Sequence, residues 1–407
     1  MSTPPLRKNR DFNILWSGQL VSTIGSQITA LAFPLLVLAV THSPARAGIV
    51  GFANTLPNLF LYLPAGALVD RWDRKRIMLV ADAGRALALG SLAIALVAHQ
   101  FWLAQLVAVA FVAGCLDVFF QLAEAAALPH VVRPEHLAQA IAQNQARQQG
   151  AGVVSRPLGG ALFALGRPVP FLFDAVSYAA SFVSLLFVRS SFQEARERPA
   201  TRLRAEIAEG VHWLWRQPFL RATTFLIAGT NFGHAALGLV VIVRARALGA
   251  SSTEIGLMLA LFAAGALVGS ALAPWIQRSV APSLLIIGSL WLWAAAMGAL
   301  YFAGNAYVLG ALCGAQALVG PGWNVVLGTY SYRLVPDRLR GRVRSVSMLV
   351  TWGTIPLGTL AAGFLAQAVG ARATFIVLAV LFAVIAAAAL GARVIRTAAT
   401  LDAMMAE

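Results

Sequence analysis

Long apolar runs separated by short polar breaks extend along almost the whole chain. Each run has roughly 20 residues or slightly more, the length that a tilted α-helix needs to cross the hydrocarbon core of a bilayer. An even number of spans places both termini on one side of the membrane. The pattern predicts twelve spans, at approximately residues 12–40, 46–69, 77–98, 102–128, 140–165, 170–189, 219–243, 254–276, 282–303, 306–332, 343–369 and 372–394.

One polar break is much longer than the others and lies between the sixth and seventh spans. We therefore expect an N-terminal six-helix bundle over residues 1–189, a cytoplasmic linker over 190–218 and a C-terminal six-helix bundle over 219–407. Within the linker, apolar residues at helical spacing predict an amphipathic helix lying on the membrane surface. An ordinary solvated linker is the alternative. The predicted apolar face contains Leu203, Ile207, Val211 and Leu214.

The two halves share a weak internal repeat. Pro134-Glu-His-Leu-Ala-Gln-Ala140 precedes the fifth span, and Pro336-Asp-Arg-Leu-Arg-Gly-Arg342 precedes the eleventh. Each segment has proline, an acid, a basic residue or histidine, and then leucine before the next helix. Such duplication is typical of transporters in which two bundles move about a site near the midplane of the bilayer.

Composition supports an integral membrane protein without a large soluble domain. The chain has 407 residues, of which 59% are hydrophobic and 12% charged, whereas soluble domains carry about 25% charged residues. Cys115 and Cys313 both fall inside apolar runs, so we interpret them as small buried hydrophobic residues and not as a disulfide. No cluster of cysteine and histidine has the spacing of a metal site, and we expect no cofactor.

The net charge of +15 follows the membrane topology. Most lysines and arginines lie in alternate loops, as the positive-inside rule describes for cytoplasmic segments. This distribution predicts that both termini are cytoplasmic and that the basic residues meet anionic lipid headgroups. We do not expect a nucleic acid partner.

The loop between the second and third spans carries the most specific motif. Gly66, Asp70, Arg71, Arg74 and Lys75 resemble the signature G-x-x-x-D-R-x-G-R-K of the major facilitator superfamily. Asp73 stands where that signature has its second glycine, and aspartate tolerates turn and left-handed conformations.

Further patterns resemble the same superfamily along nearly the whole chain. They are Asp82 with Arg85, Asp117-Val-Phe-Phe, Pro157-Leu-Gly-Gly160, Phe171-Leu-Phe-Asp174-Ala-Val-Ser-Tyr178 and Leu339-Arg-Gly-Arg342. Together they are similar to the branch of twelve-span drug:proton antiporters that includes macrolide-efflux and enterobactin-export proteins. The resemblance implies an all-α integral membrane protein with twelve helices in two pseudo-symmetric six-helix bundles. It also implies a monomer in the bacterial cytoplasmic membrane.

The resemblance further implies a conformational latch at the signature loop. In the superfamily, the acid at the end of the second span lies near the start of the eleventh. Here Asp70 would face the segment that contains Arg340 and Arg342, where a helix N-terminus and positive charge favour a carboxylate. Alternatively, the charges of the loop only anchor the topology.

Ionisable residues inside the spans are the candidates for proton coupling, because they are costly in a bilayer and are functional by default. Asp117, Gln121 and Glu124 have the spacing i, i+4, i+7 and share one face of the fourth span. We expect Asp117 or Glu124 to carry the proton and Arg156 to be the counter-ion of Asp117. Pairing within the bundle for packing alone is the alternative. We interpret Asp82 with Arg85 as a local ion pair. Asp174 is expected to have a helix-start or packing role, and a role in an external gate is the alternative.

The resemblance implies that the first, fourth, seventh and tenth spans line a central cavity. The mildly polar set expected there suits a bulky amphipathic molecule. For His234 the more common role is at a helix interface. The candidates are Gln19, Thr23, Ser26, Gln27, Gln121, Thr230, Asn231, His234, Gln316, Trp323 and Asn324.

These observations predict a secondary active transporter and not an enzyme. We expect proton-coupled efflux of a hydrophobic or amphipathic small molecule by alternating access. The compound could be a drug, a macrolide-like antibiotic, a siderophore or a secondary metabolite. The chain has no P-loop signature, so the proton gradient is the expected energy source. A proton-coupled importer or symporter is the alternative, and a non-transporting membrane sensor is a third class.

Overall fold

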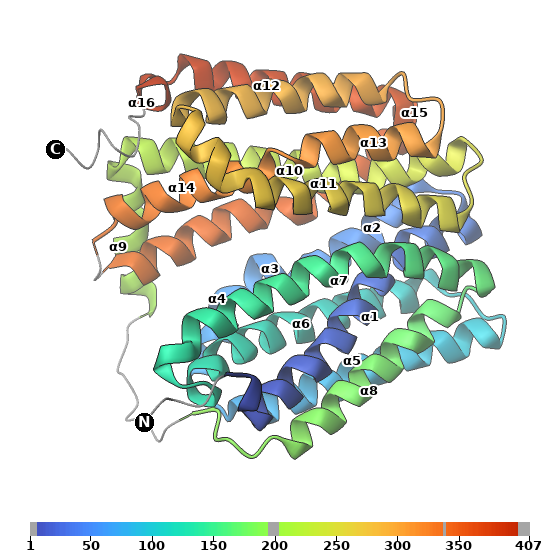
Figure 1. The fold of residues 1–407 in the computed structure, drawn as a ribbon. Helices are drawn as coiled ribbons and strands as arrows, with labels where there is room; N and C mark the ends of the chain where they lie inside the picture. The colour runs from blue at the N-terminus through green and yellow to red at the C-terminus, as the bar shows by residue number, and fades with distance from the viewer. Residues whose placement is uncertain (1–5, 194–202, 337–338, 398–407) are drawn as a thin grey trace. The chain divides into compact units, whose positions relative to one another are not determined.

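The computed structural model describes residues 6–193, 203–336 and 339–397, and this part of the chain contains helices and no strand (Figure 1). Every one of the twelve predicted apolar segments is helical. The all-α membrane fold predicted from the hydropathy pattern is therefore confirmed.

The helices of the first half follow the predicted spans with small changes at their ends. They are η1 (Leu6–Lys8), α1 (Arg10–Thr41), α2 (Pro44–Thr55), α3 (Pro57–Phe60), α4 (Tyr62–Val69), α5 (Arg74–Val97), α6 (Leu103–Val131), η2 (Pro134–His136), α7 (Leu137–Leu165) and α8 (Val169–Phe187).

The second half begins with the helix predicted in the linker. Its helices are α9 (Leu203–Arg216), α10 (Pro218–Ala247), α11 (Ser252–Ser279), α12 (Pro282–Leu300), α13 (Ala306–Ala317), α14 (Gly320–Leu334), α15 (Arg340–Gly391) and α16 (Arg393–Arg396).

Among the described residues, eight helices are long and apolar enough to cross a membrane, and α2–α3 with α4 form a ninth candidate that is bent by 55°. The remaining predicted spans are not separate long apolar helices, for the following reasons. The 52-residue α15 holds two of them, joined at Gly370, whose φ of 83° is the left-handed region that favours glycine. α7 carries several glutamines together with Arg147 and Arg156, and the tenth span is interrupted between α13 and α14.

The chain divides into two compact units. Unit 1 holds Met1–Thr41, Ile49–Pro199 and Ser251–Gly256, and unit 2 holds the remainder. The main division lies between Pro199 and Ala200, inside the linker predicted over 190–218.

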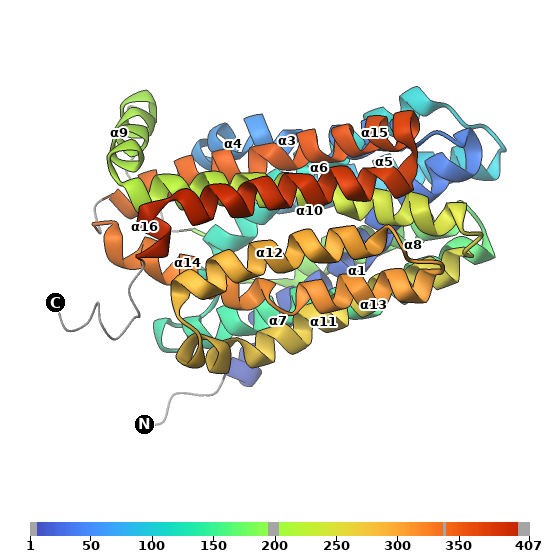
Figure 2. The ribbon, with the colours of Figure 1, turned by 90° about the horizontal axis from the view of Figure 1, so that it is seen from above.

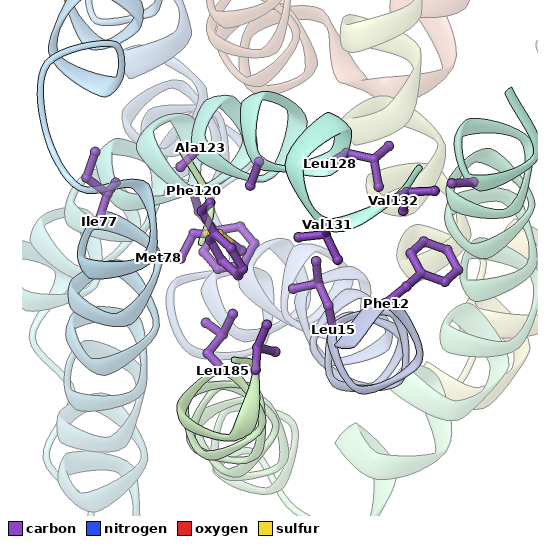
Figure 3. Close-up of a cluster of buried hydrophobic side chains, with 14 of the residues drawn as sticks. Phe12, Leu15, Ile77, Met78, Phe120, Ala123, Leu128, Val131, Val132 and Leu185 are labelled. Atoms are coloured by element: carbon purple, nitrogen blue, oxygen red, sulfur yellow. The ribbon is translucent and has the colours of Figure 1, made fainter. Parts of the chain in front are cut away.

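In unit 1, α1 packs against α7 and α8, and α5 packs against α6 and α8 (Figure 1). Figure 3 shows the buried apolar cluster near one end of these helices, where Phe12 and Leu15 of α1, Met78 of α5 and Leu185 of α8 are labelled. Met78 and Leu185 are completely buried. Such burial stabilises the bundle by about 1.5–3 kcal/mol for each large side chain relative to water, and it fixes the polar cavity described below.

Small residues let α1 and α8 approach closely. A Cβ atom added to Gly18 would lie 2.1 Å from the Ser184 hydroxyl oxygen, and one added to Gly25 would lie 2.3 Å from that of Ser177. Glycine and serine at such contacts are typical of helices that pack tightly in membranes. The contact brings the polar face of α8 directly against α1.

In unit 2, α10 and α12 both pack against α15 (Figures 1 and 2). The predicted linker helix α9 also packs against α15, where Leu214 joins a buried cluster with Val343 and Val346. Val211, which was predicted on the same apolar face, is 44% exposed. The side chains of residues 203–207 lie outside the described set.

Candidate functional site

The signature loop folds as a helix end followed directly by a helix start. α4 ends at Val69, and Asp73 is the N-cap of α5 with φ −64° and ψ 111°. Its side chain accepts a hydrogen bond from the backbone N–H of Arg76 at 3.1 Å. Asp73 therefore adopts an extended and not a left-handed conformation, and it replaces the glycine of the signature by supplying a cap.

Two basic residues of the loop hold the ends of neighbouring helices. Arg74 is buried, and its Nη1 donates to the carbonyl oxygens of Ala126 at 2.9 Å and Phe192 at 3.1 Å. Lys75 Nζ donates to the carbonyl oxygen of Val188, the C-cap of α8, at 2.7 Å. Lys75 therefore satisfies a carbonyl at the negative end of α8, whereas Arg74 joins α5 to α6 and to the segment that follows α8.

The remaining residues of the predicted latch are more exposed. The Asp70 side chain is 66% exposed and lies 3.6 Å from Arg74 Nη2. Arg71 is exposed and lines a surface cavity of about 590 Å³. In unit 2, Arg342 forms an ion pair with Glu209 of α9, and Arg340 begins α15. Asp70 and Arg342 each pair within their own unit, and the latch between them stays a prediction.

Gly66 does not serve close packing, because a Cβ atom added there would meet no other atom within 4 Å among the described residues.

A polar cavity of about 300 Å³ lies within unit 1. All the predicted candidates from the first and fourth spans line it together with residues that the sequence did not single out for it. The predicted set is Gln19, Thr23, Ser26, Gln27, Asp117, Gln121 and Glu124, and the additional polar residues include Asn54, Asn58, Arg85, Gln148, Asp174 and Tyr178.

Arg85 is the centre of an ion-pair network beside this cavity. Its Nη2 donates to Asp82 Oδ1 at 2.6 Å, which confirms the predicted local pair. Its Nη1 donates to Asp117 Oδ1 at 3.1 Å. The guanidinium also lies over the rings of Tyr178 at 4.2 Å and Phe120 at 4.5 Å. Ion pairs and aromatic faces together stabilise a buried guanidinium in a bilayer.

The predicted pairing of Asp117 with Arg156 was therefore wrong. The two oxygens of Asp117 accept from Arg85 and from Gln121 Nε2, the latter at 2.6 Å. The physical reason is packing: α5, which carries Arg85, packs along α6 much more extensively than α7, which carries Arg156. Asp117 and Arg156 are at a comparable depth in neighbouring spans of the sequence, but equal depth does not by itself bring two side chains into contact.

Glu124 has its own partner on α7. Arg147 Nη2 donates to Glu124 Oε1 at 2.7 Å, and both side chains are largely buried. The sequence showed Arg147 only as an arginine within a helix. A carboxylate that is paired in this way is stabilised in its ionised form.

One face of α8 contributes three further polar residues that the sequence analysis left out of the site. Ser181 Oγ donates to Asp82 Oδ2 at 2.6 Å, and Gln19 Nε2 of α1 donates to Ser181 Oγ at 2.9 Å. Asp174 and Tyr178 line the cavity. Their spacing from Ser181, i, i+4 and i+7, places them on one helix face and was the signal available in the sequence.

The candidates in unit 2 are built into helix contacts. Asn231 Nδ2 donates to the carbonyl oxygen of Thr351 at 2.8 Å, and His234 Nδ1 lies 2.8 Å from that of Thr230. The His234 ring lies 4.8 Å from the Trp293 ring, which lies 5.3 Å from that of Trp323.

The carbonyl oxygen of Gln316 accepts from Trp293 Nε1 at 3.0 Å, whereas Asn324 is exposed. His234 thus lies at an aromatic helix interface.

Comparison with known proteins decides the family. The profile of the MFS_3 family, described as transmembrane secretion effector, matches residues 2–406. The chain belongs to this family of major facilitator superfamily transporters.

Curated relatives of this MFS transporter include exporters. The multidrug efflux pump Tap of Mycolicibacterium fortuitum is 27% identical over 372 residues, covering 88% of this chain and 90% of the pump. Tap of Mycobacterium tuberculosis strain H37Rv is 29% identical, with 88% of both chains covered. The enterobactin exporter EntS of Citrobacter koseri is 27% identical, covering 70% of this chain and 68% of the exporter.

Solved structures agree on the fold. A bacterial homologue of the human lysosomal transporter Spinster aligns with a TM-score of 0.75 at 15% identity, covering 98% of this chain and 99% of the homologue. The nucleoside transporter NupG aligns with a TM-score of 0.78 at 9% identity, covering 94% and 98%. Both likenesses show the fold alone.

Proposed function

We propose that this MFS transporter exports a hydrophobic or amphipathic small molecule from the bacterial cytoplasm in exchange for protons. The observation that carries the proposal is the cavity of unit 1, which is lined by Asp117, Glu124, Asp174 and Arg85. Arg85 pairs there with Asp117 and also with the buried Asp82. Buried carboxylates in a membrane protein are typical of proton pathways. The similarity to the Tap pumps and to EntS supports export.

The substrate class follows from the cavity lining and the relatives. Amide and hydroxyl groups from α1 and α6 lie beside apolar residues such as Phe33, Leu89 and Phe120. Such a surface accepts an amphipathic compound, for example a drug, a macrolide-like antibiotic, a siderophore or a secondary metabolite. Each proton that moves down 100 mV supplies about 2.3 kcal/mol for its export.

We further propose that the protein works as a monomer in the inner membrane, with both termini cytoplasmic. Substrate would bind to the inward-open state, and protonation from outside would favour its release and reset the cycle. The exposed Asp70 would meet the start of α15 near Arg340 and Arg342 in one state only, which stabilises that state.

Transport into everted membrane vesicles tests the proposal. We expect accumulation of a labelled substrate, chosen by a drug-susceptibility panel in a host that lacks its own pumps, when the vesicle interior is acidic. A proton ionophore should abolish it, and vesicles without the protein serve as the control. Gradient-independent equilibration would contradict coupling, and accumulation only in right-side-out vesicles would identify an importer instead.

A further inference from the structure

The carboxyl group of Asp174 differs in its hydrogen bonds from the other acids in and beside the cavity. Asp82 accepts from Arg85 and from Ser181, each at 2.6 Å, so both of its oxygens have a donor. Asp117 also has a donor at each oxygen, and Glu124 accepts from Arg147. Hydrogen bonds and cations of this kind stabilise an ionised carboxylate.

Asp174 has much weaker support for a negative charge, although its side chain is fully buried. Oδ1 lies 3.0 Å from Ser177 Oγ, but the same hydroxyl lies 2.8 Å from the backbone carbonyl oxygen of Asp174. One hydroxyl has one hydrogen to donate. Oδ2 is buried and makes no hydrogen bond to any residue that the structure describes. A buried carboxylate with so little hydrogen-bond support is costly, and the neutral acid costs much less.

The groups that face Asp174 offset only part of this cost. α1 contributes Gly25, where an added Cβ atom would lie 2.4 Å from Asp174 Oδ1, and Thr29, whose buried hydroxyl is a second, weaker donor to the Asp174 carboxyl group. Tyr178 follows one turn later on α8 and stacks on Arg85 of α5. That guanidinium already pairs with Asp82 and with Asp117 of α6. The cation that acts on Asp174 is therefore already paired with two other acids.

We propose that Asp174 holds the exchangeable proton of the transport cycle, in place of the Asp117 or Glu124 expected from the sequence. This inference rests on the proposed proton coupling. With the proton on Asp174, Arg85 pairs with Asp82 and Asp117, as the structure shows. When the proton leaves toward the cytoplasm, the new charge on Asp174 attracts Arg85 and weakens its pair with Asp117. Protonation thereby changes the contacts among α5, α6 and α8, which can bias two conformations.

Infrared difference spectroscopy of the purified protein in lipid tests this directly. The spectra compare acidic with alkaline pH and report the carbonyl stretch of a protonated carboxylic acid. We expect the wild type to show this band, Asp174→Asn to lose it, and Asp117→Asn to keep it. Carboxyl-labelled aspartate in the wild type should shift the same band. This measurement keeps the proposal testable even where a variant does not fold.

Transport by the same variants separates the inference from the proposed function. Asp174→Asn should lose proton-driven accumulation but retain exchange of labelled for unlabelled substrate. Asp73→Asn, the same acid-to-amide change at a residue outside the cavity, should retain both. The assignment is overturned if the band survives in Asp174→Asn, if it is missing from the wild type, or if labelled aspartate does not shift it. If the carbonyl band is assigned to Asp174 but the wild type shows no proton-driven transport, the proposed proton coupling is wrong and the protonation of Asp174 stands.

Discussion

Asp73 shows how one side chain can replace a glycine of a family signature. The signature loop needs a start for α5, and the Asp73 carboxylate provides it by accepting from the Arg76 N–H at 3.1 Å. Asp73 is partly exposed, so its neighbouring ion pair with Arg76 contributes little. The cap is the main contribution of this residue.

We expect Asp73→Ala to lower the free energy of unfolding by about 1 kcal/mol, because the first turn of α5 loses its cap. Asp73→Asn keeps a capping oxygen and is the matched control. Thermal unfolding of the purified transporter in detergent measures the difference. An unfolding temperature for Asp73→Ala equal to that of the wild type would mean that the cap has no energetic role.

At the scale of elements, the contact between α1 and α8 depends on small residues. Gly25 leaves no room for a side chain beside Ser177 and Asp174, whereas an added Cβ atom at Gly90 of α5 would meet nothing within 4 Å among the described residues. Replacing each glycine by alanine therefore distinguishes two effects. The change at Gly25 adds crowding, whereas the change at Gly90 adds only the helix preference of alanine.

We expect Gly25→Ala to destabilise the protein by about 1–3 kcal/mol, because overpacking forces α1 away from α8. Gly90→Ala should be neutral or stabilising by up to about 1 kcal/mol, because alanine favours a helix. The fraction of detergent-solubilised protein that remains monodisperse after heating measures both. Equal loss in the two variants would argue against close contact as the cause.

At the scale of the whole molecule, the charged residues of the signature loop differ in their surroundings. Arg74 and Lys75 donate to backbone carbonyl oxygens of neighbouring segments inside unit 1, so they are structural. Asp70 is 66% exposed and has only a 3.6 Å contact with Arg74. It is the acid of this loop that remains available for the start of α15.

We expect Asp70→Asn to slow the exchange between conformations while leaving substrate affinity largely unchanged, because the cavity does not include Asp70. Single-molecule fluorescence between labels on the two units measures the exchange, and equilibrium binding measures the affinity. Lys75→Met is the control, because it removes a helix-end contact within unit 1. Its main effect should be a lower unfolding temperature and not slower exchange between conformations. A loss of affinity in Asp70→Asn as large as that in Asp117→Asn would refute this division of roles.

The sequence by itself determined the class of protein, because long apolar runs must be membrane helices and the motifs match one superfamily. It also placed Asp117, Gln121 and Glu124 on one helix face, since the 3.6-residue period follows from local geometry. Only the tertiary structure decided which charges pair. Arg85, not Arg156, meets Asp117, and Asp174 lies fully buried beside the cavity. Both outcomes depend on which helices pack together, and hydropathy does not encode those neighbours.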